Sequence, residues 1–100
     1  MEQDVTLTSS IHTYLRARRL DGYSEKTLYS YKLHLKRLIL DLGGGTPIGG
    51  VRLEHLRTHL TSLTHLQTSS LANKVRALKA FFKWLYEEEI LERNPALKLR

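Results

Sequence analysis

The sequence predicts an all-α fold, a bundle of four helices, and three observations carry this prediction. Apolar residues recur at steps of three and four along most of the chain. Residue types that begin helices, and glycines that end them, divide the chain into four such segments. No stretch has the alternation of a half-buried strand. With 41% hydrophobic residues among 100, one small core is expected.

The first helix is expected to begin near Leu7 and to end at Gly22. Either Thr6 or Thr8 is the expected N-cap, because a hydroxyl accepts a hydrogen bond from a free N–H of the first turn. Arginines gather in its last turn, where the helix dipole favours positive charge. Its buried face is predicted to be Leu7, Ile11, Tyr14 and Leu15.

The second helix is expected to have Ser24 as its N-cap and to run to Leu42, where Gly43-Gly44-Gly45 stops it. Residues 43–50 hold five glycines and Pro47, so they form no regular element. This segment lacks the Gly-Lys-Ser/Thr ending of a phosphate-binding P-loop, which favours a flexible connection. The helix's apolar stripe is Leu28, Tyr31, Leu35, Leu38, Ile39 and Leu42.

The third helix is expected over residues 52–65, and the fourth from Thr68 to about Glu89. A proline at position 95 marks the latest point at which the fourth helix ends. Phe81 is expected in the core rather than on a base-stacking surface, whereas Trp84 lies off the main stripe. The apolar stripe of the third helix is Leu53, Leu56, Leu60 and Leu63. That of the fourth helix is Leu71, Val75, Leu78, Phe82, Leu85 and Tyr86.

The chain is basic, with 16 Lys and Arg against 10 Asp and Glu, a net charge of +6. Such a balance is typical of nucleic-acid binding, and the alternative is a basic but merely solvated surface. The absence of cysteine excludes disulfides and cysteine zinc sites. No apolar run is long enough for a membrane span, and the N-terminus does not resemble a signal peptide. A cytoplasmic, nucleoid-associated location without a membrane partner is expected.

Two helix starts combine small hydroxyl side chains with lysine. Residues 23–27 read Tyr-Ser-Glu-Lys-Thr, and residues 68–74 read Thr-Ser-Ser-Leu-Ala-Asn-Lys. The free N–H groups of a helix start suit a phosphate, and a serine that caps its helix keeps a proton to donate. The alternative for Ser24 is capping alone.

The polar sides of the same two helices continue these starts. On the second helix they comprise Lys26, Ser30, Lys36 and Arg37, with Thr27 at the border. On the fourth they comprise Asn73, Arg76, Ala77, Ala80 and Lys83. Asparagine pairs with an adenine edge and arginine with guanine in the major groove of DNA. Glu87-Glu88-Glu89 and Glu92 repel phosphate, so contact is expected at the N-terminal half. An ordinary solvated face is the alternative.

No catalytic or metal-binding constellation is found. His55 and His59 are four residues apart on the third helix, but a third ligand and the His-Glu-x-x-His pattern are missing. Solvated or half-buried histidines are therefore favoured, and no metal or cofactor is expected.

The ordered set of these signals resembles the N-terminal core-binding domain of tyrosine recombinases, the phage-integrase family. It comprises Tyr14-Leu15, residues 23–27, Tyr31 with the Leu35 to Leu42 run, and residues 51–56. It continues with Asn73, Lys74, Leu78, Phe81 and Phe82, and ends with Ile90 and Asn94-Pro95. Arg52 departs from the pattern, because the family often has a threonine cap before the third helix.

The resemblance implies a SAM-like four-helix domain over residues 6–97 that forms half of a clamp on duplex DNA. It also implies that residues 1–5 are a tail and that residues 98–100 begin a linker to an absent C-terminal catalytic domain. That domain holds the family's nucleophilic tyrosine, so this chain is not expected to be an enzyme. The implied DNA-binding residues are Ser24, Lys26, Thr27, Ser30, Lys36, Ser69, Ser70, Asn73, Lys74, Arg76 and Ala77.

The implied partners are double-stranded DNA, the catalytic domain of the parent chain and other recombinase protomers on DNA. The alternative is a small helical protein-interaction or oligomerisation module. Salt separates the two, because binding through several phosphates weakens steeply as salt rises and an apolar interface does not.

Overall fold

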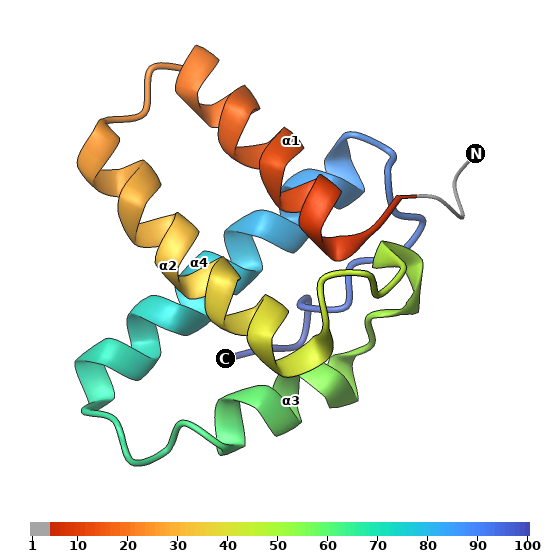
Figure 1. Ribbon diagram of the computed structural model, residues 1–100. Helices are drawn as coiled ribbons and strands as arrows, with labels where there is room; N and C mark the ends of the chain where they lie inside the picture. Colours follow the sequence, from red (N-terminus) through yellow and green to blue (C-terminus); the bar gives the residue numbers. More distant parts are fainter. Residues whose placement is uncertain (1–4) are drawn as a thin grey trace. The chain divides into compact units, whose positions relative to one another are not determined.

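A computed structural model describes residues 5–100, and the prediction of an all-α fold is confirmed for this part of the chain. Two compact units divide it, residues 5–49 and residues 50–100. The helices follow in the expected order (Figure 1). They are α1 (Leu7–Leu20), α2 (Glu25–Leu42), the short 3-10 helix η2 (Ile48–Gly50), α3 (Leu53–Thr61) and α4 (Thr68–Glu87).

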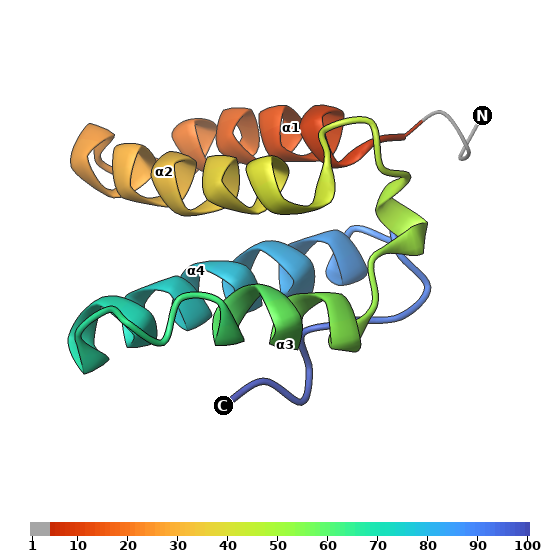
Figure 2. The ribbon, with the colours of Figure 1, turned by 60° about the horizontal axis from the view of Figure 1, so that its bottom comes forward.

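The first unit is a hairpin in which α1 and α2 lie side by side and run in opposite directions (Figures 1 and 2). Gly22 has a φ of 91° in the connection, a conformation that suits glycine because it has no Cβ. Leu28, Leu35 and Leu38 of α2 are buried as predicted. On α1 the buried apolar residues are Leu7, Ile11 and Tyr14, and Leu15 is half-buried.

Thr6, rather than Thr8, caps α1. The Ser9 N–H donates to Thr6 Oγ1 at 3.1 Å, and the Thr6 N–H donates to Ser9 Oγ at 3.0 Å, which together make a capping box. The Thr8 N–H instead donates to the carbonyl of Gly44 at 3.1 Å. A Cβ on Gly44 would clash with the Thr8 hydroxyl, so this close approach requires glycine.

The glycine-rich segment is a structured turn rather than the flexible connection expected from its composition. The Leu7 N–H donates to the carbonyl of Thr46 at 2.8 Å, and the Ile48 N–H donates to that of Val5 at 3.0 Å. These bonds tie both the segment and Val5 to the start of α1. Of the predicted tail, residues 1–4 lie outside the described residues.

Most of the positive charge at the end of α1 is already paired. The Arg18 guanidinium lies over the rings of Tyr14 and Tyr23, 5.3 Å and 5.1 Å from their centroids, and also contacts Asp21 at 3.1 Å. Burial raises the pKa of the Tyr14 phenol, which keeps it neutral near pH 7. Arg19 donates two hydrogen bonds to the Glu25 carboxylate, at 3.1 and 3.0 Å. The exposed charge of this unit is therefore concentrated on α2.

In the second unit, α3 is shorter than predicted because it ends at Thr61 instead of residue 65. The Ser62 hydroxyl donates to the carbonyl of His59 at 2.6 Å and so satisfies one of the last carbonyls of the helix. At its start, the Arg52 N–H donates to His55 Nδ1 at 3.0 Å. His55 thus takes the place that Glu or Gln has in a capping box, while no side chain caps the N–H groups of the first turn. His59 is buried rather than solvated or half-buried.

Helix α4 contributes a wide buried face, and it ends at Glu87 instead of at about Glu89. Tyr86, predicted in the core, is half-exposed, while Trp84, off the predicted stripe, is buried. Leu99 is also buried, and Lys79 Nζ donates to its carbonyl at 3.0 Å. The buried residues of the helix are Ala77, Leu78, Phe81, Phe82, Trp84 and Leu85.

Candidate nucleic-acid interface

The polar residues predicted on the second helix share one exposed side of α2. Lys26, Ser30, Lys36 and Arg37 are all exposed, and we call them the α2 face. At 100° per residue, these four positions fall within about 120° of the helix circumference. No acidic residue lies between them in the sequence, since the acidic residues of α2 are Glu25 and Asp41 at its ends. The α2 face therefore presents three positive charges on a single side of one helix.

The hydroxyls at the start of α2 bind each other. Ser24 Oγ accepts from the Thr27 N–H at 3.1 Å, and the Ser24 hydroxyl donates to Thr27 Oγ1 at 3.0 Å. The first bond confirms Ser24 as the N-cap. The second occupies the proton that was expected to remain available for a phosphate. Of the two residues, Thr27 keeps a hydroxyl proton to donate, and it is half-buried.

Three large apolar side chains that the sequence prediction did not include lie beside the α2 face. Tyr29, Leu33 and Leu40 are 63%, 49% and 72% exposed. At 100° per residue, their spacing places all three within about 40° of helix circumference. This helical spacing is visible in the sequence, but only the buried stripe of the helix was predicted from it.

The start of α4 lacks a side-chain cap. Gln67 occupies the N-cap position, and its side chain makes no capping hydrogen bond. The first intrahelical bond runs from the Leu71 N–H to the carbonyl of Gln67, so the N–H groups of Thr68, Ser69 and Ser70 have no acceptor within the helix. All three residues are exposed. Three hydroxyls and the N–H groups of the first turn are thus gathered at an open helix end.

Asn73 and Arg76 form a pair one turn further along α4. Arg76 Nη1 donates to Asn73 Oδ1 at 2.9 Å, and both residues are exposed. An amide oxygen has two lone pairs, so Asn73 keeps capacity for another donor while Arg76 fixes its orientation. Five residues of α4 fall within about 120° of the helix circumference, at 100° per residue. We call them the α4 face: Ser69, Asn73, Arg76, Lys79 and Lys83.

Three predicted residues of α4 lie elsewhere. Ala77 has an exposed fraction of 1%, so its prediction as a DNA-contacting residue is wrong. Ala77 lies four residues after Asn73, so it is rotated by 40° from Asn73 toward the buried side of the helix. The sequence-based helical wheel placed the border of the buried side beyond Ala77. Lys74 is half-buried, and Ser70 is exposed near it rather than on the α4 face.

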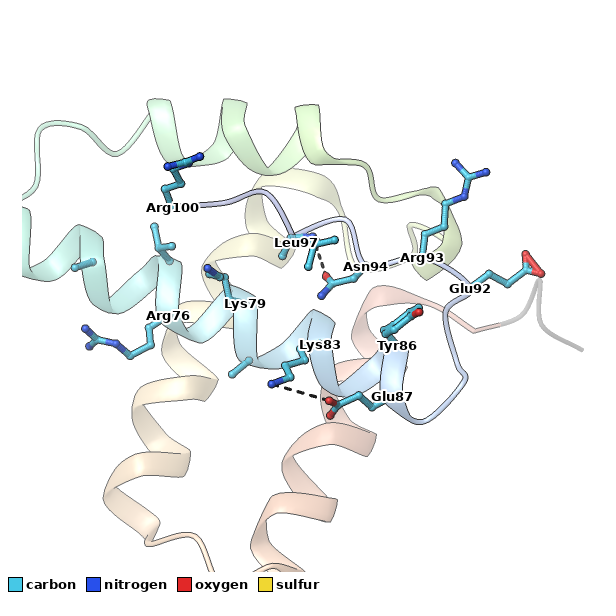
Figure 3. A pocket seen from close by; sticks show the side chains of 14 residues that line it. Arg76, Lys79, Lys83, Tyr86, Glu87, Glu92, Arg93, Asn94, Leu97 and Arg100 are labelled. Atoms are coloured by element: carbon cyan, nitrogen blue, oxygen red, sulfur yellow. Dashed lines mark hydrogen bonds and ion pairs between the residues drawn. The ribbon is translucent and has the colours of Figure 1, made fainter.

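The outer side of α4 also forms one wall of an open groove, with the C-terminal segment as the other wall (Figure 3). Its volume is about 1210 Å³. Figure 3 shows Lys79 and Lys83 on the α4 wall, where Lys83 Nζ lies 4.0 Å from Glu87 Oε2. The apolar lining includes Ala72, Ala80 and Ala96, together with the exposed side chains of Tyr86 and Leu97. The basic residues that line it are Arg76, Lys79, Lys83, Arg93 and Arg100.

Neither a membrane span nor a metal cluster is found in the part of the chain that the structure describes. No helix within residues 5–100 has the length and apolar character to cross a bilayer. Those residues also contain no group of three His, Cys, Asp or Glu side chains placed to hold a metal ion. His55, one of the two histidines considered for a metal, serves instead at the start of α3.

Comparison with known proteins identifies the class to which the chain belongs. Residues 11–92 match the family model described as the phage integrase N-terminal SAM-like domain. The chain therefore belongs to this family, and the resemblance drawn from the order of its motifs is confirmed.

The chain is also similar to tyrosine recombinases named XerC. Two of them, from strains of Bifidobacterium longum, are each 33% identical over 94 residues, which cover 90% of this chain and 26% of the relative. One from Pediococcus pentosaceus is 29% identical over 94 residues, which cover 89% of this chain and 31% of the relative. The chain thus spans about a quarter to a third of these relatives. No solved structure matches it significantly.

Proposed function

We propose that this chain is a DNA-binding domain of a site-specific tyrosine recombinase. In this role it forms half of a clamp on duplex DNA and positions the duplex for integration or recombination. The observation that supports the proposal best is the α2 face, where three cations share one exposed side of a helix in a member of this family. A phosphate backbone is the extended polyanion that such a surface binds.

The α4 face supplies the second half of the proposal. Its uncapped start offers N–H and hydroxyl donors to a phosphate, and the Asn73–Arg76 pair faces solvent one turn later. Phosphate contacts fix the position of the domain on the duplex, and side chains at base edges add sequence preference. The proposed DNA-binding residues are Ser24, Lys26, Thr27, Ser30, Lys36, Ser69, Ser70, Asn73, Lys74 and Arg76, without Ala77.

The chain itself cuts no DNA under this proposal. The relatives to which it is similar are named as tyrosine recombinases, and it matches only a part of their length. Its partners are then duplex DNA, a catalytic domain of the same parent protein and other recombinase protomers bound to the same DNA. The place of action is the cytoplasm, at the nucleoid.

The direct test is a titration of the chain with a fluorescent duplex of random sequence at several salt concentrations. Non-specific binding with a dissociation constant of about 10⁻⁴–10⁻⁶ M is expected at physiological salt. Lys36→Ala and Lys74→Ala each remove one phosphate contact, so each should weaken binding to all sequences alike. Each should also reduce the slope of log affinity against log salt by about 1.

Lys98→Ala is the matched control, because Lys98 is an exposed lysine outside both faces. Its affinity and salt slope should equal those of the unaltered chain. If Lys36→Ala and Lys74→Ala behave like this control, neither the α2 face nor Lys74 of α4 binds DNA.

The groove beside α4 favours a second candidate, a protein-interaction module. An open groove of about 1210 Å³, whose lining includes Ala72, Ala80 and Leu97, suits a peptide segment better than a rigid duplex. Binding through apolar side chains depends little on salt, whereas binding through phosphates depends on it steeply. A partner that remains bound as salt rises, together with absence of duplex binding, would favour this candidate.

A further inference from the structure

The stripe of Tyr29, Leu33 and Leu40 is not explained by the charge of the α2 face. Single apolar side chains on a surface are ordinary, but these three share one arc of a helix that is otherwise basic. Leu33 lies one turn from Ser30 and one turn from Lys36 and Arg37. The apolar stripe is thus embedded among the residues proposed to contact DNA.

The position of the stripe between cations indicates which atoms of DNA its side chains contact. Its neighbours on either side are cations, which suit the two phosphate backbones that border a groove. A side chain between those cations then faces the base edges. In the major groove, the one apolar group at a base edge is the C5-methyl of thymine, and apolar side chains read it.

From this placement we propose that Leu33, with Tyr29 beside it, reads thymine methyl groups in the major groove. This proposal rests on the proposed function and specifies what its α2 face recognises. Along the helix axis, Tyr29 and Leu33 are separated by about 6 Å. This is nearly twice the spacing of about 3.4 Å between bases of one strand, so the two side chains reach thymines about two steps apart. Leu40, three turns from Tyr29, extends the same apolar edge.

The test compares an alternating dA·dT duplex with the same duplex carrying uracil in place of thymine. Uracil lacks only the C5-methyl, so charge and base pairing are retained. Burial of one methyl-sized group corresponds to about a fourfold change in affinity. For each thymine methyl that the domain buries, the unaltered chain should therefore bind the uracil duplex about fourfold more weakly. Leu33→Ala should lose the share of this preference that Leu33 contributes, about fourfold, and the double variant Tyr29→Ala/Leu33→Ala should bind both duplexes equally.

Leu20→Ala is the matched control, because Leu20 is an exposed leucine of the same unit at the end of α1. It should keep the full preference for thymine over uracil. A second probe places the same methyl on another base. An alternating dG·dC duplex with 5-methylcytosine should bind the unaltered chain more tightly than one with cytosine, and Leu33→Ala should reduce that gain.

The failures of the two proposals are distinguishable. If thymine and uracil duplexes bind equally but Lys36→Ala weakens both, the domain binds DNA and methyl reading is overturned. A Leu33→Ala variant that keeps the full thymine preference also overturns it. If neither duplex binds, the proposed function fails, and methyl reading fails with it.

Discussion

Helices α2 and α4 begin with similar residues but use them differently. In α2, the hydroxyls of Ser24 and Thr27 bind each other and the Thr27 N–H. In α4, Gln67 makes no side-chain cap, and the hydroxyls of Thr68, Ser69 and Ser70 are exposed. The two sequences predict the same kind of anion site. In the structure, the hydroxyls at the start of α2 are hydrogen-bonded within that start, whereas the start of α4 has no side-chain cap.

The exposed sides of the two helices also differ, in their charge and in the groups they present. The α2 face combines three cations with a neighbouring apolar stripe and no acidic residue between its members. The α4 face carries an ordered Asn73–Arg76 pair and then meets acidic residues from Glu87 onward. We infer a division of labour in which α2 supplies charge and apolar contact, and the first half of α4 supplies hydrogen bonds.

Base preference should show the largest effect of this division. Asparagine discriminates adenine by about 1–3 kcal/mol when it pairs with both of its major-groove atoms. Asn73→Ala should therefore remove a preference for adenine at one position of a base-substitution panel, while overall affinity changes less. Arg76→Ala should lose the same preference, because Asn73 Oδ1 is no longer held, and should also lose a phosphate contact.

The exposed residue Lys32 of α2 gives the control, since Lys32→Ala changes charge without touching this pair. Its base panel should match that of the unaltered chain. A panel that is identical for Asn73→Ala and for the unaltered chain would remove the reading role from α4.

The next largest effect is expected in the free energy of unfolding, which should fall for a variant at the start of α2 but not for one at the start of α4. Ser24→Ala removes the N-cap of α2 and should lower the free energy of unfolding by about 1 kcal/mol. Ser69→Ala removes no capping bond, so it should change the free energy of unfolding by less than about 0.5 kcal/mol. Urea denaturation followed by circular dichroism measures both. Equal losses for the two variants would mean that the starts do not differ as described.

The helices and the family were accessible from the sequence because both rest on periodic spacing and on the order of residue types. Ser24 as N-cap and the buried Leu28, Leu35 and Leu38 follow from these rules alone. Ala77 and Tyr86 were misplaced because each lies near the border of a helix stripe, where a rotation of a few tens of degrees decides burial.

Other features depend on contacts between distant residues and give no local signal. The turn that places Gly44 against Thr8 joins two segments that are far apart in the sequence. The groove exists because Lys79 holds the carbonyl of Leu99, twenty residues away, beside α4. The role of His55 at the start of α3 is local, but it was missed because histidine is not a usual helix-capping residue.

The smallest expected effect tests where DNA contact on α4 ends. Lys83 and Glu87 are both exposed and 4.0 Å apart, and such a pair contributes about 0.3–0.5 kcal/mol at most. Glu87→Gln loses this attraction but also removes a negative charge from the C-terminal end of the helix, where it is unfavourable. The two changes oppose each other, so the free energy of unfolding should move by less than about 0.5 kcal/mol.

If DNA meets only the first half of α4, releasing Lys83 from Glu87 should leave duplex affinity nearly unchanged at low salt. A clear gain in affinity would instead extend the contact to Lys83 and bring the basic wall of the groove into the DNA-binding surface. Glu88→Gln separates direct contact from a general change in charge, because it removes an exposed carboxylate next to Glu87 without releasing Lys83. A gain that only Glu87→Gln gives means that Lys83 itself meets a phosphate, whereas an equal gain for Glu88→Gln means that removal of a carboxylate alone is responsible.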